Sequence, residues 1–161
     1  METATISDEH IILEVCQGNK EKYSEIIKRY EKKLLRYAIY LLGDEHDSKD
    51  VVQESFLKAY ILLNNFNRKK KFSSWIYRIV HNESLNLLNK NKKRVILDAD
   101  YKPESGENLE EDFIKRNLQE MTKRCLLQIP VIYREPITLF YLEEKKYEEI
   151  SDILKIPLKK V

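Results

Sequence analysis

The strongest constraint on the fold is a helical repeat of apolar residues that runs without interruption from Tyr23 to Leu42. Apolar side chains recur there at intervals of three and four residues, the spacing that places them on one face of an α-helix. Gly43 follows directly, and glycine commonly ends helices. The chain has only 3 Gly and 4 Pro and is 35% charged, a composition that favours helices over a turn-rich β fold. The sequence therefore predicts an all-α fold, with one apolar helix face made of Tyr23, Ile26, Ile27, Tyr30, Leu34, Tyr37, Ala38, Leu41 and Leu42.

Three further helices are expected beside this one, which would give a compact four-helix bundle over the first part of the chain. Each expected start has a Ser, Asn or Asp whose side chain can accept a hydrogen bond from a free backbone N–H. In the last two helices, apolar residues again recur at helical spacing and leave a polar outer stripe. The expected starts are Ser7 or Asp8, Asn19, Asp44 or Asp47, and Ser73 or Ser74, and the expected ends are Gly18, Gly43, the turn 64–67 and about Lys92.

The charge along the last two of these helices reverses sign. Residues 44–54 contain five acids and one lysine, a net charge of −4, whereas residues 68–94 contain nine Lys or Arg and one acid, a net charge of +8. The whole chain is nearly neutral at +2, so the distribution of charge along the chain, and not the net charge, indicates which partners it binds. An acidic patch followed by a basic, aromatic-rich one suits a protein that docks on another protein and holds nucleic acid at the same time.

An acidic segment separates this bundle from a second, smaller unit. Residues 97–112 contain seven acids and one base, together with a proline and a glycine that break any helix. The sequence of the second unit predicts a helix, a turn and a short helix, as in a helix-turn-helix domain. The sequence stops at Val161, before the expected last helix of that domain. Its first apolar repeat comprises Leu118, Met121, Cys125 and Ile129. The predicted boundaries are 1–94 for the bundle, 95–108 for the linker and 109–161 for the truncated helix-turn-helix domain.

The sequence contains no pattern typical of a catalytic or metal site. Cys16 and Cys125 are isolated, which argues against a disulfide framework or a zinc site. The 3 histidines are scattered, and there is neither a glycine-rich phosphate loop nor a Ser or Cys in a nucleophile context. The N-terminus lacks the pattern of a signal peptide, and no stretch approaches a membrane span. We therefore expect a cytoplasmic protein that is not an enzyme, has no cofactor or metal and does not insert into a membrane.

Several stretches, in a consistent order, resemble the extracytoplasmic-function (ECF) sigma factors of bacterial RNA polymerase. The clearest are DSKDVVQESFLKAY at 47–60, FSSWIYRIVHN at 72–82 and YREPITLFYLEEKKYEEISDILKIP at 133–157, with a weaker match over 30–42. The resemblance implies a sigma factor that directs sequence-specific transcription initiation. Its bundle would bind core RNA polymerase and melt the −10 promoter element, and its second unit would contact the β flap and read the −35 element.

The resemblance also implies roles for individual residues. The loop after the third helix would hold an unstacked −10 base, and the fourth helix would engage the melted strand or the adjoining duplex. Asn side chains offer a donor and an acceptor to base edges, whereas Arg and Lys hold phosphates. The residues implied for docking on the β′ clamp helices are Asp47, Asp50, Gln53, Glu54 and Lys58. Those implied for binding promoter DNA are Asn64, Asn65, Asn67, Arg68, Lys69, Lys70, Lys71, Phe72, Trp75, Tyr77, Arg78, Asn82, Asn86, Lys90 and Lys93.

Other roles are open for some of these residues. Trp75 could equally pack in the core, and the same alternative holds for Phe72 and Tyr77. Asp47 also suits a helix N-terminus, where a negative charge is favourable. Glu54 lies too far into its helix to gain from that effect, so a basic partner outside the chain explains it better.

The sequence departs from the family pattern at several positions, which keeps other functions open. Asn86 stands where the family usually has an acid, Lys145-Lys146 replaces a glycine-containing turn, and Lys159-Lys160 replaces a Gly-Thr pair. One alternative is a degenerate, interaction-only sigma-like module, and another is a helical regulator that binds duplex DNA by itself. An anti-sigma factor, typical of the family, is a further hypothetical partner.

Overall fold

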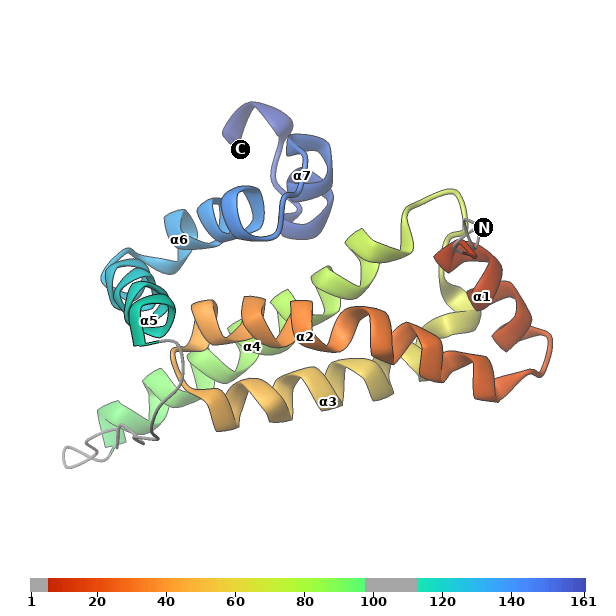
Figure 1. Ribbon diagram of the computed structural model, residues 1–161, viewed down its shortest axis with the longest axis horizontal. Coiled ribbons are helices and arrows are strands. Elements are labelled where there is room, and N and C mark those ends of the chain that lie inside the picture. The colour runs from red at the N-terminus through yellow and green to blue at the C-terminus, as the bar shows by residue number, and fades with distance from the viewer. Residues whose placement is uncertain (1–5, 98–112) are drawn as a thin grey trace.

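The computed structural model describes residues 6–97 and 113–161, and every regular element in these residues is helical (Figure 1). The all-α fold predicted from the sequence is confirmed. Helices α1 to α4 form one bundle, and α5 to α7 form a smaller unit on the side of the bundle opposite α3 (Figure 1). The elements are α1 (Asp8–Cys16), η1 (Lys20–Lys22), α2 (Tyr23–Leu42), α3 (Glu45–Leu62), η2 (Leu63–Asn65), α4 (Phe72–Leu97), α5 (Phe113–Leu127), α6 (Val131–Ile137), η3 (Thr138–Leu142), α7 (Tyr147–Leu154) and η4 (Leu158–Lys160).

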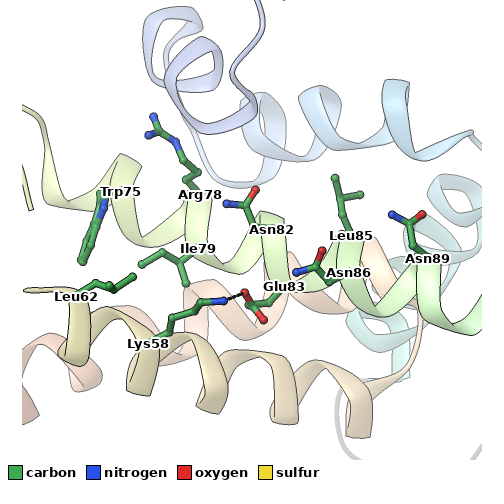
Figure 2. Close-up of a pocket in the computed structure, with 10 residues that line it drawn as sticks. All are labelled: Lys58, Leu62, Trp75, Arg78, Ile79, Asn82, Glu83, Leu85, Asn86 and Asn89. Carbon is green, nitrogen blue, oxygen red and sulfur yellow. Dashed lines mark hydrogen bonds and ion pairs between the residues drawn. The ribbon is translucent and has the colours of Figure 1, made fainter. Parts of the chain in front are cut away.

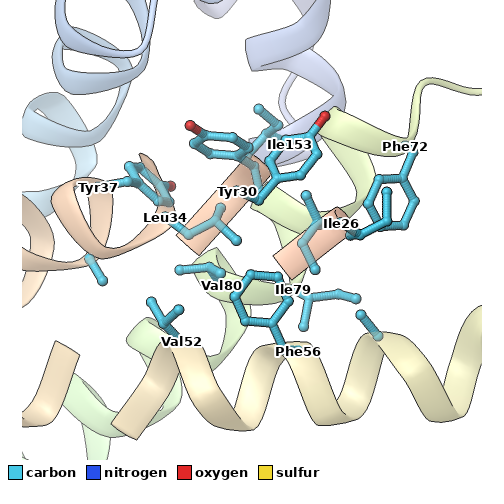
Figure 3. Close-up of a cluster of buried hydrophobic side chains, with 14 of the residues drawn as sticks. Ile26, Tyr30, Leu34, Tyr37, Val52, Phe56, Phe72, Ile79, Val80 and Ile153 are labelled. Carbon is cyan, nitrogen blue, oxygen red and sulfur yellow. The ribbon is translucent and has the colours of Figure 1, made fainter. Parts of the chain in front are cut away.

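The core of the bundle lies between α2, α3 and α4, and α1 covers one end. The buried face of α2 is the one that the apolar repeat predicted, and it includes Ile26 and Leu34. Phe56 from α3 and Val80 from α4 meet these side chains in the core (Figure 3). Removal of this continuous apolar surface from water is the main force that holds the bundle together.

Local capping explains where three of the helices begin or end. The Ser7 hydroxyl accepts a hydrogen bond from the His10 backbone N at 3.2 Å, which starts α1. The Asp44 carboxylate accepts one from the Asp47 backbone N at 2.7 Å, which starts α3. Gly43 ends α2 with a φ of 79°, a left-handed conformation that glycine adopts without strain. These boundaries agree with the prediction.

Three helix boundaries differ from the prediction, one of them the start of α4, which lies at Phe72 and not at Ser73 or Ser74. The 3-10 turn η1 precedes α2, and Asn19, expected to cap α2, directs its side-chain amide to Glu14 at 3.5 Å. Helix α4 does not end near Lys92 but continues to Leu97. The start of the expected linker 95–108 is therefore helical, and the remainder of that segment lies outside the described residues.

The second unit contains the helix, turn and short helix that the sequence predicted. Pro136 lies inside α6, where it lacks the N–H that would continue the helical hydrogen bonds, and a π-helical turn, η3, follows. Leu139 of η3 and Ile150 and Ile153 of α7 are fully buried and join the hydrophobic core of the bundle. The two units therefore share one continuous core.

Helix α5 packs on a different face from the one that its apolar repeat predicted. Leu118 and Met121 are mainly exposed, whereas Leu126 is buried. Leu127 approaches the end of α2 so closely that a Cβ added to Gly43 would lie 3.0 Å from the Leu127 Cδ2 atom. The orientation of α5 is thus set by its contact with α2, which the repeat within α5 does not encode.

Candidate interface for protein and nucleic acid

The outer face of α3 carries the acidic stripe that the sequence predicted for protein docking. Asp50, Gln53 and Glu54 are exposed and lie three or four residues apart, so they share one helix face. Asp47 is half-buried, and its backbone N–H is the one that the Asp44 side chain holds. A basic surface on another protein can therefore reach Asp50 and Glu54 more easily than Asp47.

Two exposed apolar side chains on α3 were missed in the prediction. Leu57 is 62% exposed and Ile61 is 74% exposed, one and two turns beyond Glu54. Lys58 lies between them and forms an ion pair with Glu83 of α4 at 2.5 Å. Their exposure could have been predicted, because Leu57 and Ile61 are four residues apart and lie on a different face of α3 from its core positions. Exposed aliphatic groups beside carboxylates suit a protein contact with an apolar centre and a polar rim.

The loop between α3 and α4 presents amides and cations to solvent, as predicted. Asn64, Asn65, Asn67, Arg68 and Lys69 are all exposed. The Lys69 backbone N donates to the Asn67 side-chain oxygen at 3.0 Å, so Asn67 also shapes the turn. This loop combines groups that can bind base edges with groups that can bind phosphates.

Three cations predicted to bind DNA contact α7 of the second unit. The Lys70 Nζ atom lies 2.9 Å from an Asp152 carboxylate oxygen, and the Lys71 Nζ atom lies 3.3 Å from a Glu149 carboxylate oxygen. The Arg78 Nε–H donates to the backbone oxygen of Asp152 at 2.8 Å. Sequence reasoning missed these contacts because it considered the two units separately.

A groove of about 550 Å³ runs along α3 and α4 (Figure 2). Leu62 and Trp75 contribute apolar surface to the groove, and Asn82, Asn86 and Asn89 contribute a row of amides from α4. Asn89 was missed in the prediction, although its spacing from Asn86 places it on the same face of the helix. An apolar wall beside a row of amides can contact both the ring face and the edge of a nucleic-acid base.

Two aromatic side chains that were predicted to bind DNA belong to the core instead. Phe72 is 0% exposed, and its ring centroid lies 5.7 Å from that of Phe66. Tyr77 is 1% exposed, and its hydroxyl donates to Glu143 at 2.6 Å. The prediction is therefore wrong for these two side chains, because burial leaves them no surface for a base. Trp75 is half-buried, packs 5.0 Å from the Phe66 ring and also lines the groove.

Lys90 and Lys93 continue the basic stripe along α4, and both are exposed. Lys90 borders a second, smaller cleft between α3 and α4 that Asp50 and Glu54 also line. The acidic stripe of α3 and the basic stripe of α4 therefore adjoin each other along this side of the bundle.

Buried carboxylates of the second unit hold it against the bundle. The Glu143 side chain is 1% exposed and accepts hydrogen bonds from the Arg36 Nε–H at 2.7 Å and from the Tyr77 hydroxyl at 2.6 Å. Burial and the neighbouring Glu143 charge raise the pKa of Tyr77 above its ordinary value. Burial and the neighbouring Glu135 charge raise the pKa of Tyr37, whose hydroxyl donates to Glu135 at 2.5 Å. Both tyrosines therefore stay neutral donors that bind carboxylates of the second unit.

Among the residues that the structure describes, no three His, Cys, Asp or Glu side chains are grouped so that they could hold a metal ion. Cys16 and Cys125 are both free thiols. Within the same residues, no helix has the length and apolar character needed to cross a membrane.

Two family models match successive parts of the chain. The model of sigma-70 region 2 matches residues 26–94, and the model of sigma-70 region 4 matches residues 119–161. The first match contains the acidic stripe, the loop and the groove. The second contains the acids of α7 and the buried carboxylates that face the bundle.

Individual proteins are similar over most of the chain. The ECF RNA polymerase sigma factor SigW of Bacillus subtilis is 29% identical over 158 residues, which are 91% of this chain and 84% of that protein. The fold of the sigma factor RpoE from Bartonella quintana, solved in complex with the anti-sigma factor NepR, is similar with a TM-score of 0.75 and 21% identity over 86% of each chain. An engineered region 2 of sigmaE, solved in complex with GTAAAA, is 31% identical with a TM-score of 0.54 over 58% of this chain and 97% of its own.

Proposed function

The chain belongs to the sigma-70 family of RNA polymerase sigma factors and is of the ECF type. On this premise we propose which of its residues bind core RNA polymerase and which bind promoter DNA during transcription initiation. A sigma factor is a DNA-binding transcription regulator that binds core RNA polymerase and directs initiation at specific promoters. The observation that carries this function is the succession of region 2, over residues 26–94, and region 4, over residues 119–161, in one chain. The comparisons favour neither a stand-alone DNA-binding regulator nor an interaction-only module.

Docking on the β′ clamp helices is assigned to the outer face of α3. Asp50, Gln53 and Glu54 supply the polar contacts, supported by their exposure on one helix face. We add Leu57 and Ile61, because these exposed aliphatic side chains extend the same face and would be removed from water in the complex. Asp47 contributes less, since it is half-buried, and Lys58 is partly neutralised by Glu83.

Opening of the −10 element is assigned to the loop after α3 and to the groove beside α4. A base that leaves the duplex loses stacking and pairing worth a few kcal/mol, and a polar pocket with an apolar wall offsets that loss. Asn64, Asn65, Arg68 and Lys69 are exposed in the loop. The groove adds Trp75 as a stacking surface and, as base-edge partners, Asn82, Asn86 and Asn89.

The domain assignment follows the same division. Residues 1–94 bind polymerase and the −10 element, and residues 109–161 bind the β flap and the −35 element. Residues 95–108 link these two domains. The exposed side chains of Tyr133 and Tyr141, on α6 and η3, offer a surface to the flap.

An anti-sigma factor is a further partner, supported by the solved complex of RpoE with NepR. The protein acts with polymerase in the cytoplasm and performs no catalysis of its own.

Binding to bacterial core RNA polymerase tests this proposal. Glu54→Lys reverses one exposed charge on the docking face and should weaken binding roughly tenfold, the effect of losing about 1.4 kcal/mol. Glu31→Lys, at another exposed acid, on α2, is the matched control and should bind like the wild type. Circular dichroism should show unchanged helix content in both variants. Absence of binding by the folded wild-type chain would overturn the sigma-factor function, and equal binding by the two variants would remove Glu54 from the docking site.

A further inference from the structure

The smaller of the two clefts between α3 and α4 has a volume of about 320 Å³, and all of its lining residues belong to these two helices. The helices are antiparallel neighbours, since Lys58 near the end of α3 meets Glu83 in the middle of α4 (Figure 2). Earlier on α3, Asp50 and Glu54 line the cleft together with Lys90, which lies later on α4. The acidic stripe of α3 and the basic stripe of α4 therefore run side by side, at the same level along the helices.

Some of the charges around this cleft are neutralised within the chain and others are not. Glu83 is paired with Lys58, and Asp47 lies in the first turn of α3, where the free backbone N–H groups offset its charge. The other charges on this face are exposed, and they are Asp50, Glu54, Lys90 and Lys93. Within the described part of the chain, the only ion pair of these four side chains joins the Asp50 carboxylate to the His46 ring at 3.4 Å. Two acids and two bases can therefore bind a partner outside the chain.

A surface with one acidic and one basic stripe is complementary to itself. A two-fold axis along the cleft, parallel to both helices, places the α3 stripe of each copy on the α4 stripe of the other. Asp50 and Glu54 of one copy then face Lys90 of the second copy, and the symmetry repeats this contact. Val51 and Leu87 also line the cleft and would lie at the centre of the contact. A purely basic partner would satisfy the acids of this face but would be repelled by its lysines.

We propose that this surface binds a second copy of the same chain and forms a symmetric dimer that is held mainly by charge. Because the contact is small and polar, the dimer is weak, with a Kd of about 10–100 µM. The dimer itself does not depend on the function proposed above, but its consequence does. The α3 acids are assigned to polymerase docking and Lys90 to DNA, so dimerisation covers both sites, and core polymerase must displace the second copy.

Sedimentation equilibrium of the full chain at low salt, at concentrations on both sides of this Kd, measures the dimer. Lys90→Glu and Glu54→Lys each turn attraction into repulsion at two symmetry-related places, so each should weaken the dimer about tenfold or more. The controls Lys32→Glu and Glu31→Lys make the same changes of charge at exposed positions on α2 and should dimerise like the wild type. Circular dichroism verifies that all four variants are folded.

An equimolar mixture of Lys90→Glu and Glu54→Lys tests the geometry of the contact. In the heterodimer, the new carboxylate on α4 of one variant faces the new ammonium group on α3 of the other, and the unchanged Glu54 and Lys90 face each other. Every pair is attractive again, so we expect the mixture to dimerise about as tightly as the wild type and to dissociate at high salt. A wild-type chain that stays monomeric at every concentration, or a mixture as monomeric as its components, would overturn the proposal. Neither result involves polymerase or DNA, so both leave the proposed function to its own test.

Discussion

Replacement of Glu143 by glutamine should reveal how strongly region 4 is held on region 2. The Glu143 side chain is 1% exposed and accepts from Arg36 at 2.7 and 3.0 Å and from Tyr77 at 2.6 Å. A glutamine side chain has one acceptor oxygen and an NH2 group that can only donate. In Glu143→Gln, Arg36 or Tyr77 therefore faces a donor where it had an acceptor, and the ion pair with Arg36 is lost.

The expected loss follows from these contacts. A hydrogen bond that involves a charged group contributes about 1.5–3 kcal/mol to stability, but the Arg36 side chain is half-exposed, so water compensates part of its loss. We expect the free energy of unfolding to fall by about 2 kcal/mol, which corresponds to roughly 4–8 °C in Tm for a chain of this size.

Urea and thermal unfolding followed by circular dichroism measure this loss. The neighbouring variant Glu144→Gln is the control, because Glu144 is exposed and its replacement should change stability by less than about 0.5 kcal/mol. A loss for Glu143→Gln no larger than that of the control would refute the reasoning, since the buried carboxylate would then contribute little to the contact between the regions.

Two other predictions concern pH and promoter opening. Stability should fall as the pH rises above about 10, because the unfolded chain loses tyrosine protons at their ordinary pKa, whereas burial raises the pKa of Tyr37 and Tyr77 in the folded chain. Circular dichroism during alkaline titration measures this, and a flat profile up to pH 12 would contradict it. Replacing Asn64 and Asn67 by alanine should reduce promoter opening, measured by the reactivity of unpaired thymines, more than it reduces polymerase binding. If both decrease equally, the loop has a structural role.

The sequence predicted best what is determined by neighbouring residues. Ser7, Asp44 and Gly43 act on the backbone within a few positions of themselves, so the ends of α1, α2 and α3 could be located from single residues. The buried face of α2 could be predicted from the spacing of its apolar residues, because that spacing also depends only on residues within the helix. The exposed loop amides were also predicted correctly, since loops run over the surface.

The sequence predicted least well what depends on distant parts of the chain. The Tyr77 ring packs 5.3 Å from the ring of Tyr37, and its hydroxyl donates to Glu143 of region 4, a partner that no pattern around position 77 encodes. The pairing of Lys70 with Asp152 likewise joins residues that are remote in sequence. Leu118 and Met121 follow a helical repeat yet remain exposed, because the end of α2 selects another face of α5.

The position of Trp75 gives the chain a built-in optical reporter. Trp75 is the only tryptophan, it packs 5.0 Å from Phe66, and it lines the groove between α3 and α4. Its indole emission depends on how much water reaches the ring and on which groups lie against it. A base that enters the groove changes both, so selective excitation of tryptophan allows occupancy of this site to be followed in the wild-type protein without an attached dye.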